Sequence, residues 1–281
     1  MEVVNSVERM REISRDLRRK AKEVGLVPTM GAFHEGHLSL IREARRRDEV
    51  VVVSLFVNPL QFGPSEDYEQ YPRDLERDVA LASCLGVDFL FAPSAEEIYP
   101  QRFDTYVTVE GLSGKLCGIS RPGHFRGVTT VVAKLFNLIL PRRAYFGQKD
   151  AQQAIIVGKM IRDLDWDIEL VMLPTVREED GLAMSSRNLY LSQQERQEAT
   201  VLYRSLCWAA ERIKAGEKEA GGIREGIREM ICSMPSARID YISVVDPETL
   251  EEIERIEGKV LVALAVWFGR ARLIDNLIIA P

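Results

Sequence analysis

The sequence has no long hydrophobic run, and we expect no export signal. Its longest apolar stretches, such as residues 260–268 and 50–57, fall far short of the roughly 20 residues that a membrane helix needs. Residues 1–20 are charged throughout and contain no apolar core of a signal peptide. We therefore expect a cytoplasmic protein with no membrane partner.

Cysteine and net positive charge are also scarce. The four cysteines, at positions 84, 117, 207 and 232, show no paired spacing, which argues against both a disulfide framework and a zinc ribbon. We expect them to be reduced and mainly structural. The net charge of −6 argues against broad binding to nucleic acid, so positive charge that handles phosphate must be local.

Histidine is rare, and its placement is informative. The chain has three histidines, His34, His37 and His124, and each lies in a glycine-rich stretch rather than in an apolar periodic run. That distribution favours chemistry over packing. The pair at the start of a helix also suits zinc, but no cysteine or third histidine lies nearby to complete a tetrahedral site. Phosphate binding is therefore favoured over metal ligation.

Strand-like apolar runs alternate with amphipathic helical stretches up to about residue 173. This is the βαβ pattern of a parallel sheet covered by helices. The expected strands cover residues 25–27, 50–56, 89–91, 143–146 and 168–173, and the expected helices cover 36–47, 74–85, 128–139 and 151–164. Ligands of such sheets bind at the carboxyl ends of the strands, where most of the polar clusters described below lie.

The pattern changes after Thr175. Residues 192–195, Ser-Gln-Gln-Glu, form a capping box that opens a helix continuing to residue 216. A second helix over 220–234 and antiparallel strands over 239–245, 259–267 and 272–279 follow. The predicted fold class is α/β, with a Rossmann-like parallel-sheet domain over residues 1–175. A smaller C-terminal α+β domain over residues 176–281 is expected to close over the active site.

Residues 31–36 form a turn between a strand and a helix. A short buried strand ends before this turn, and apolar residues resume at helical spacing after it. The free backbone N–H groups and the helix dipole of such a turn attract anions. His34 and His37 lie about one helical turn apart on the same face, so both can point at the same phosphates as donors. We predict a triphosphate site here.

Two amides follow the next buried strand. Asn58 and Gln61 lie in a turn that contains Pro59 and Gly63. Amides orient a nucleophilic carboxylate and leave its charge available, whereas a bidentate arginine would over-stabilise it. The pair therefore suggests a neutral pocket for a carboxylate substrate. For Asn58 alone, stabilisation of the turn is an equally good explanation.

Aspartates occupy the start of the following helix. Asp78 lies one turn after Asp74 on the same face, and either can hold Mg²⁺ through water. Because Mg²⁺ usually takes one or two protein carboxylates together with the phosphates of a nucleotide, Asp78 alone would suffice. Solvation at the surface is the commoner fate of a helical aspartate.

Three later segments carry further polar groups. Residues 121–127 are basic and rich in glycine, and they either present cations to an anion or form a mobile loop. Lys149 lies at phosphate reach where a strand meets a helix, next to Asp150, which fits an N-cap or a ribose contact. In residues 181–188, two hydroxyls and the guanidinium of Arg187 can clamp phosphates as the domains close.

These motifs resemble known signatures. His34-x-Gly36-His37 and Met184-Ser185-Ser186-Arg187 look like the two signatures of the nucleotidyltransferase and class I aminoacyl-tRNA synthetase superfamily. Over residues 28–188 the complete set is similar to the pantothenate synthetase family. The set adds Pro28-Thr29-Met30-Gly31, Phe56-Val57-Asn58-Pro59, Gln61-Phe62-Gly63, Tyr71-Pro72-Arg73, Arg121-Pro122-Gly123-His124-Phe125 and Phe146-Gly147-Gln148-Lys149-Asp150. Gln148 departs from the pattern, because many members are expected to have glutamate there.

The resemblance implies a ligase that forms a C–N bond in the biosynthesis of pantothenate and coenzyme A. The carboxylate of pantoate would attack the α-phosphorus of ATP to give pantoyl adenylate and pyrophosphate, and the amine of β-alanine would then displace AMP. Mg²⁺ would accompany ATP, and a homodimer is expected. Catalysis would come from positioning and charge stabilisation, which agrees with the lack of an evident nucleophile paired with a base.

The resemblance also implies roles for single residues. Catalytic roles would fall to His37, which is the first choice for a donor, and to His34, Lys149 and Arg187. ATP would be bound by Met30, His34, His37, Gly147, Lys149, Asp150, Val176, Met184, Ser185, Ser186 and Arg187. Pantoate would be bound by Met30, Asn58, Gln61, Val131 and Gln153, and Asp78 would belong to the Mg²⁺ shell.

Two other functions are weighed against this one. A nucleotidyltransferase acting on a phosphorylated acceptor would need a phosphate-bearing substrate and would keep a nucleotide in its product. A non-catalytic ATP-binding module would need only part of the phosphate-binding set, and the presence of His34, His37, Lys149 and Arg187 together argues against it.

Overall fold

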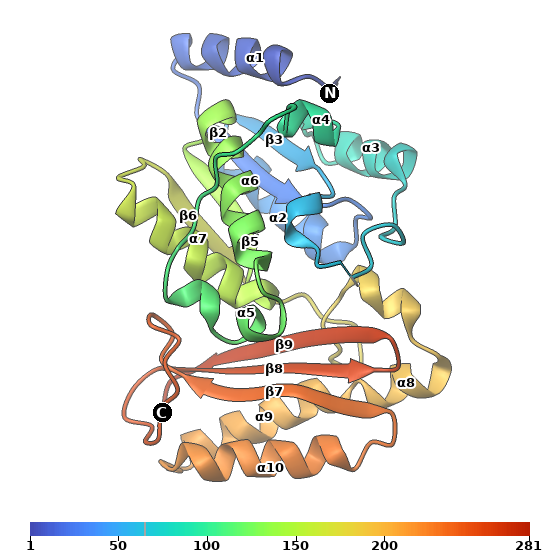
Figure 1. Ribbon diagram of the computed structural model, residues 1–281, viewed down its shortest axis with the longest axis vertical. Helices are drawn as coiled ribbons and strands as arrows, with labels where there is room; N and C mark the ends of the chain where they lie inside the picture. Colours follow the sequence, from blue (N-terminus) through green and yellow to red (C-terminus); the bar gives the residue numbers. More distant parts are fainter. Residues whose placement is uncertain (65) are drawn as a thin grey trace. The chain divides into compact units, whose positions relative to one another are not determined.

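A computed structural model describes residues 1–64 and 66–281, which form two compact units (Figure 1). Unit 1 comprises Met1–Ser113, Arg121–Gly147 and Ile156–Pro174, and unit 2 comprises Gly114–Ser120, Gln148–Ile155 and Thr175–Pro281. The predicted boundary near Thr175 lies where the chain enters unit 2 for the third time. The two earlier entries involve short segments without a sequence signal for a domain boundary.

Unit 1 contains a six-stranded parallel sheet in the order β1-β4-β3-β2-β5-β6. Its strands are β1 (Glu2–Val4), β2 (Val24–Thr29), β3 (Val50–Leu55), β4 (Phe89–Phe91), β5 (Arg143–Gly147) and β6 (Glu169–Leu173). The strand order reverses between β2 and β5, which are neighbours in space but far apart in the sequence. A ligand site is expected outside the carboxyl ends of the strands at such a switch point. The predicted Rossmann-like sheet is confirmed.

The helices of unit 1 largely match the predicted pattern. They are α1 (Val7–Arg19), α2 (Glu35–Arg47), α3 (Leu75–Cys84), α4 (Ala95–Ile98), α6 (His124–Ile139) and α7 (Ala151–Asp163), which begins in unit 2. Strand β1 and helix α1 were not predicted, although the hydroxyl of Ser6 caps α1 by accepting from the N–H of Arg9. Helix α6 begins four residues before its predicted start, directly after Gly123 in the left-handed region.

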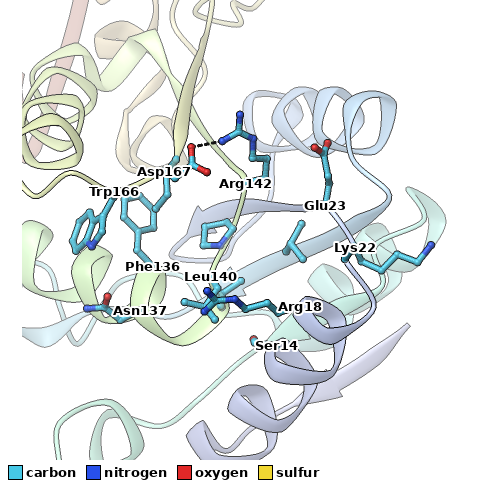
Figure 2. A pocket seen from close by; sticks show the side chains of 15 residues that line it. Ser14, Arg18, Lys22, Glu23, Phe136, Asn137, Leu140, Arg142, Trp166 and Asp167 are labelled. Carbon is cyan, nitrogen blue, oxygen red and sulfur yellow. Dashed lines mark hydrogen bonds and ion pairs between the residues drawn. The ribbon is translucent and has the colours of Figure 1, made fainter.

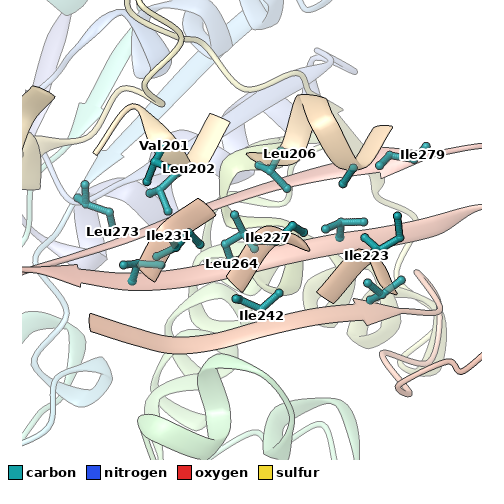
Figure 3. Packing of buried hydrophobic residues seen from close by; sticks show 14 of the residues in the cluster. Val201, Leu202, Leu206, Ile223, Ile227, Ile231, Ile242, Leu264, Leu273 and Ile279 are labelled. Carbon is teal, nitrogen blue, oxygen red and sulfur yellow. The ribbon is translucent and has the colours of Figure 1, made fainter. Parts of the chain in front are cut away.

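Unit 2 joins an antiparallel sheet to a layer of helices (Figure 3). The strands are β7 (Ala237–Val245), β8 (Val260–Phe268) and β9 (Ala271–Ile279), and the helices are α5 (Cys117–Ser120), α8 (Gln193–Glu198), α9 (Val201–Lys214) and α10 (Ala220–Cys232). One face of α9 and one of α10 bury leucine and isoleucine side chains, among them Leu206 and Ile227, in the same cluster as Leu264 of β8. The predicted small α+β domain is confirmed.

One predicted helix is divided in two. The capping box at Ser192 and Glu195 is present, but the helix that it opens ends at Glu198, and α9 follows as a separate helix. The hydroxyl of Thr200 donates to the carbonyl of Gln197 at 2.8 Å. Such local bonds compete with the helical ladder, which explains the break.

Two expectations from composition can be compared with the structure. All four cysteines are free. In the part of the chain that the structure describes, no helix combines the length and the hydropathy that crossing a membrane requires.

Candidate active site

A tight turn after β2 carries the two histidines. Gly31 and Ala32 both have left-handed backbones, with φ of 86° and 52°, and Phe33 is buried in the core of unit 1. The carboxylate of Asp78, on α3, accepts hydrogen bonds from the N–H groups of Ala32 at 2.7 Å and Phe33 at 2.8 Å. His34 then caps α2. The turn is thus fixed by core packing and by a buried carboxylate.

The prediction of free backbone N–H groups in this turn is wrong for the groups that the hydrogen bonds identify. Besides the two N–H groups bound by Asp78, that of Gly31 donates to the Thr29 hydroxyl at 3.3 Å, and that of Gly36 donates to Nδ1 of His34 at 3.1 Å. The N–H of His34 donates to Nδ1 of His37 at 3.4 Å. Because these donors are used internally, they do not support the predicted binding of an anion by the backbone of the turn.

The same hydrogen bonds define the tautomer of both histidines. Nδ1 accepts from a backbone N–H in His34 and in His37, so the proton of each neutral ring is assigned to Nε2. The ring centroids lie 4.2 Å apart. In its neutral form, each ring then has its N–H donor at Nε2, a group that can donate to a phosphate oxygen.

The predicted amide pair lies beside this turn in unit 1. Asn58 is buried at the N-cap of the 3₁₀ helix η1 (Pro59–Gln61), and its Nδ2 donates to the carbonyl of Gly127 at 3.0 Å and to Oε1 of Gln61 at 3.3 Å. Nε2 of Gln61 lies 2.7 Å from the sulfur of Met30. The structure therefore brings Met30, Asn58 and Gln61 together, as predicted for a pantoate pocket.

Tyr99 supports the amide pair and was missed by the sequence analysis. Its hydroxyl donates to Oδ1 of Asn58 at 2.9 Å, and burial raises the pKa of Tyr99 well above its ordinary value. The phenol therefore stays protonated and fixes the orientation of the Asn58 amide. A tyrosine 41 positions away, beyond α3, β4 and α4, carries no local signal of this role.

The basic segment 121–127 contacts the amide turn. The guanidinium of Arg121 forms two hydrogen bonds to Glu66, at 2.7 and 2.6 Å, and its Nη2 also donates to the carbonyl of Gln61 at 3.2 Å. Nδ1 of His124 donates to that carbonyl at 2.7 Å, and Nη1 of Arg121 lies 3.1 Å from Nε2 of His124. Burial raises the pKa of Glu66, but the hydrogen bonds and charge of Arg121 outweigh burial and hold it below its ordinary value. The segment holds the Gln61 turn.

Gly127 allows helix α6 to approach this turn. A Cβ atom on Gly127 would lie 2.2 Å from the carbonyl oxygen of Leu60 and 2.6 Å from the nitrogen of Gln61, so only glycine fits without moving the backbone. Val131, which was predicted to contact pantoate, lies one turn further along α6 and is buried.

The predicted metal ligand Asp78 is a poor fit for direct coordination of Mg²⁺. It is 1% exposed, each of its oxygens accepts a backbone N–H, and burial raises its pKa above the ordinary value. Over residues 1–64 and 66–281, no group of three or more histidine, cysteine, aspartate or glutamate side chains is arranged to hold a metal ion. A role of Asp78 in a water-mediated shell stays a prediction.

The remaining predicted residues lie mainly in unit 2. Gly147 ends β5, and the 3₁₀ helix η3 (Gln148–Asp150) follows it in the chain. Buried Asn276, on β9, donates through Nδ2 to the carbonyls of Gln148 at 2.9 Å and Lys149 at 3.0 Å. Lys149 Nζ lies 3.9 Å from Asp150 Oδ2. Asn276 therefore fixes the backbone that carries Lys149, and Gln153, half-buried on α7, follows in the same unit.

The second predicted phosphate loop is a short hairpin followed by a 3₁₀ helix. The N–H of Met184 donates to the carbonyl of Val176 at 3.0 Å, so these two residues are neighbours. Ser185 caps η4 (Ser186–Tyr190) by accepting from the N–H of Arg187 at 3.2 Å. The structure thus brings Val176, Met184, Ser185 and Arg187 together within unit 2.

Within unit 1, a cavity of about 450 Å³ lies at the amino ends of β2, β5 and β6 (Figure 2). Its walls include Arg18 and Lys22 near the end of α1, and the aromatic rings of Phe136 and Trp166. It contains none of the predicted site residues. It lies at the opposite end of the strands from the carboxyl ends, where ligands of such sheets bind.

Comparisons with known proteins agree with these motifs. The family described as Pantoate-beta-alanine ligase matches residues 2–278. The pantothenate synthetase of Caldicellulosiruptor bescii is 54% identical over 279 residues, which cover 99% of this chain and 99% of that protein. The pantothenate synthetase of Thermotoga petrophila is 56% identical over 279 residues, which cover 99% of this chain and 100% of that protein. Among solved structures, pantothenate synthetase from Thermus thermophilus matches with a TM-score of 0.94 and 50% identity over 100% of both chains.

A further solved structure carries ligands. The pantoate-beta-alanine ligase of Francisella tularensis, described as complexed with beta-gamma ATP and beta-alanine, matches with a TM-score of 0.80 and 32% identity over 99% of this chain and 97% of that one.

Proposed function

The chain belongs to the pantoate-beta-alanine ligase family, and from this premise we propose that it joins pantoate to β-alanine at the expense of ATP. One observation carries the assignment of the site. Nε2 of Gln61 contacts Met30, which directly precedes the histidine turn. A carboxylate held by the amide pair would therefore lie beside phosphates held by the two histidines, as adenylation of a carboxylate requires.

The reaction has two displacement steps. A carboxylate oxygen of pantoate attacks the α-phosphorus of ATP, and the bond to the β,γ-diphosphate breaks to release pyrophosphate. The amine of β-alanine then attacks the activated carbonyl, loses a proton, and displaces AMP as the amide forms. Both steps build negative charge on oxygen, which the Nε2–H groups of His34 and His37 can stabilise by donating hydrogen bonds.

The family motifs that lie in unit 2 carry further proposed contacts. Lys149, Ser185, Ser186 and Arg187 would bind the phosphates, and Arg187 and Lys149 would carry the positive charge that the histidine turn lacks. Gly147 and Asp150 would contact the ribose, Val176 and Met184 the adenine side, and Gln153 pantoate. The support is the match of these positions to the family motifs and the ATP and β-alanine named for the Francisella tularensis structure.

Three further properties belong to the proposal. Mg²⁺ would enter with ATP, bound by phosphates and water, and would neutralise phosphate charge. The active species would be a homodimer, and its location would be the cytoplasm. The poor fit of Asp78 to direct coordination is why the metal is assigned to the nucleotide here.

Pyrophosphate exchange into ATP tests the proposal most directly. With β-alanine omitted, exchange that requires pantoate would establish the adenylate half-reaction and its substrate together. Exchange that instead requires a phosphorylated acceptor would support a nucleotidyltransferase. Binding of ATP without any exchange would support a non-catalytic ATP-binding module.

A further inference from the structure

The carboxylate of Asp78 is used by the backbone of the histidine turn. It is 1% exposed on α3, and its two oxygens accept the N–H groups of two consecutive residues, Ala32 and Phe33. A carboxylate that receives one N–H on each oxygen holds both peptide groups in a fixed orientation. The strongest contacts of Asp78 are therefore with the protein itself.

The turn needs these hydrogen bonds because the backbone conformation of Ala32 is unfavourable. Gly31 tolerates a φ of 86°, but Ala32, at 52°, has a Cβ atom that disfavours the left-handed region. A Cβ atom on Gly31 would lie 3.0 Å from Oδ2 of Asp78, so the close approach also requires glycine at that position. Without the carboxylate, the N–H groups of Ala32 and Phe33 would lack these partners, and the strain at Ala32 would favour a different turn.

The conformation of the turn decides what the histidines present. His34 follows Phe33 directly, and the Nδ1 atoms of His34 and His37 accept from the N–H groups of Gly36 and His34. If the turn relaxes, these two acceptor contacts loosen, and the ring proton is no longer confined to Nε2.

We propose that Asp78 is a positioning residue that holds the histidine turn so that His34 and His37 present Nε2–H donors. The proposal rests on the proposed function for its kinetic consequence, but not for its structural one. It differs from a role in the Mg²⁺ shell, in which Asp78 would act on the metal and would leave the tautomers of the histidines unchanged.

The test compares D78N with A32G, the double variant A32G/D78N, and the control E76Q, which removes an exposed carboxylate from the same turn of α3. In D78N one acceptor becomes an NH₂ group that faces a backbone N–H. In A32G the left-handed backbone no longer carries a Cβ atom, so the turn needs the carboxylate less. If Asp78 positions the turn, A32G should rescue D78N. If D78N is defective because a metal ligand is lost, A32G should not rescue it.

The first readout is the ¹⁵N chemical shift of the imidazole nitrogens in the ligand-free protein, where only three histidines need assignment. We expect Nε2–H rings at His34 and His37 in the unaltered protein and in E76Q, mixed tautomers in D78N, and restored Nε2–H rings in the double variant. Unchanged tautomers in folded D78N would overturn the proposal. If D78N does not fold, the double variant carries the test, and an unfolded double variant would also overturn it.

The second readout is the rate of pantoate-dependent turnover across a range of Mg²⁺ concentrations. We expect kcat of D78N to fall about 10²-fold, as for a misplacement of reacting groups, at every Mg²⁺ concentration. A loss that disappears at high Mg²⁺ would contradict positioning and support the metal shell. Because the tautomer readout needs no substrate, failure of the proposed ligase activity and failure of this proposal are distinguishable.

Discussion

The two ends of the parallel sheet each bury an aspartate, but they compensate its charge differently. At the amino end, Asp48 pairs with the guanidinium of Arg143 at 2.8 Å and accepts from the hydroxyl of buried Tyr145, and Arg143 also pairs with Glu23 at 2.8 Å. At the carboxyl end, Asp78 accepts backbone N–H groups. The first arrangement joins the starts of several strands, whereas the second shapes one turn. Partners therefore indicate whether a buried charge serves the fold or the site.

The largest expected effect is at the amino end. D48A should lower the free energy of unfolding by about 2–5 kcal/mol, because it leaves the hydroxyl of Tyr145 without its acceptor and Arg143 with only Glu23 and Glu169 as partners. Denaturant unfolding measures the loss, and KM for both ATP and pantoate should stay unchanged. D167N, which removes an exposed partner of Arg142 at the same end, is the control and should cost about 0–1 kcal/mol. A change in either KM for D48A would show that Asp48 also affects the binding of substrates, so that the two ends of the sheet would not differ in this way.

The next largest effect is expected from two substitutions of His37, one of which keeps only its acceptor and the other only its donor. In H37N, Oδ1 can replace Nδ1 as acceptor for the N–H of His34, but the Nε2 donor is lost, so kcat should fall about 10²–10³-fold. In H37Q the donor is kept and the acceptor is lost, and the fall should be smaller. Steady-state kinetics on both variants measure the difference. Equal losses would show that the ring acts in another way than as an Nε2 donor.

A smaller effect is expected where α6 meets the amide turn. G127A inserts a methyl group 2.2 Å from the carbonyl of Leu60, and the backbone shift that relieves it should cost about 1–3 kcal/mol. If Gln61 binds pantoate, its displacement should also raise KM for pantoate, with KM for ATP little changed. The control is G158A on α7, where a Cβ atom would meet only ordinary contacts from 3.7 Å. A rise of both constants together would argue against a pantoate-specific role of the turn.

The smallest effect concerns pH. The pKa of Glu66 is lowered, so its contribution to stability is complete above the ordinary carboxyl pKa and is lost as the pH falls through the lowered one. The pKa of Asp78 is raised, so its contribution is complete below the ordinary value and is lost as the pH rises through the raised one. Denaturation midpoints of E66Q and D78N against pH should therefore change slope in opposite directions. Changes of the same sign would show that one of the two shifts has the wrong direction.

The sequence predicted the sheet and the amide pair because both depend on local patterns. Apolar runs of strand length define the parallel strands, and a polar residue that follows such a run lies at the carboxyl end. Asn58 and Gln61 were found in this way, whereas Met30 was named only through the resemblance to the family. Their roles in binding pantoate stay predictions.

What the sequence did not reveal depends on contacts between distant segments. Tyr99 and Asn276 lie far along the chain from the residues that they orient, and nothing beside them signals a partner. The sequence analysis also missed the partners of the histidine turn, whose backbone N–H groups were expected to be free. Asp78, 45 residues after Phe33, accepts two of them, and a local pattern cannot reveal such a partner.

The tautomers of the two histidines have a calorimetric consequence. Rings that already donate from Nε2 while neutral need not take up a proton from solution when a phosphate binds them. The observed enthalpy of nucleotide binding would then contain no heat of buffer ionisation from these rings. The turn after β2 would recognise an anion without drawing protons from its surroundings.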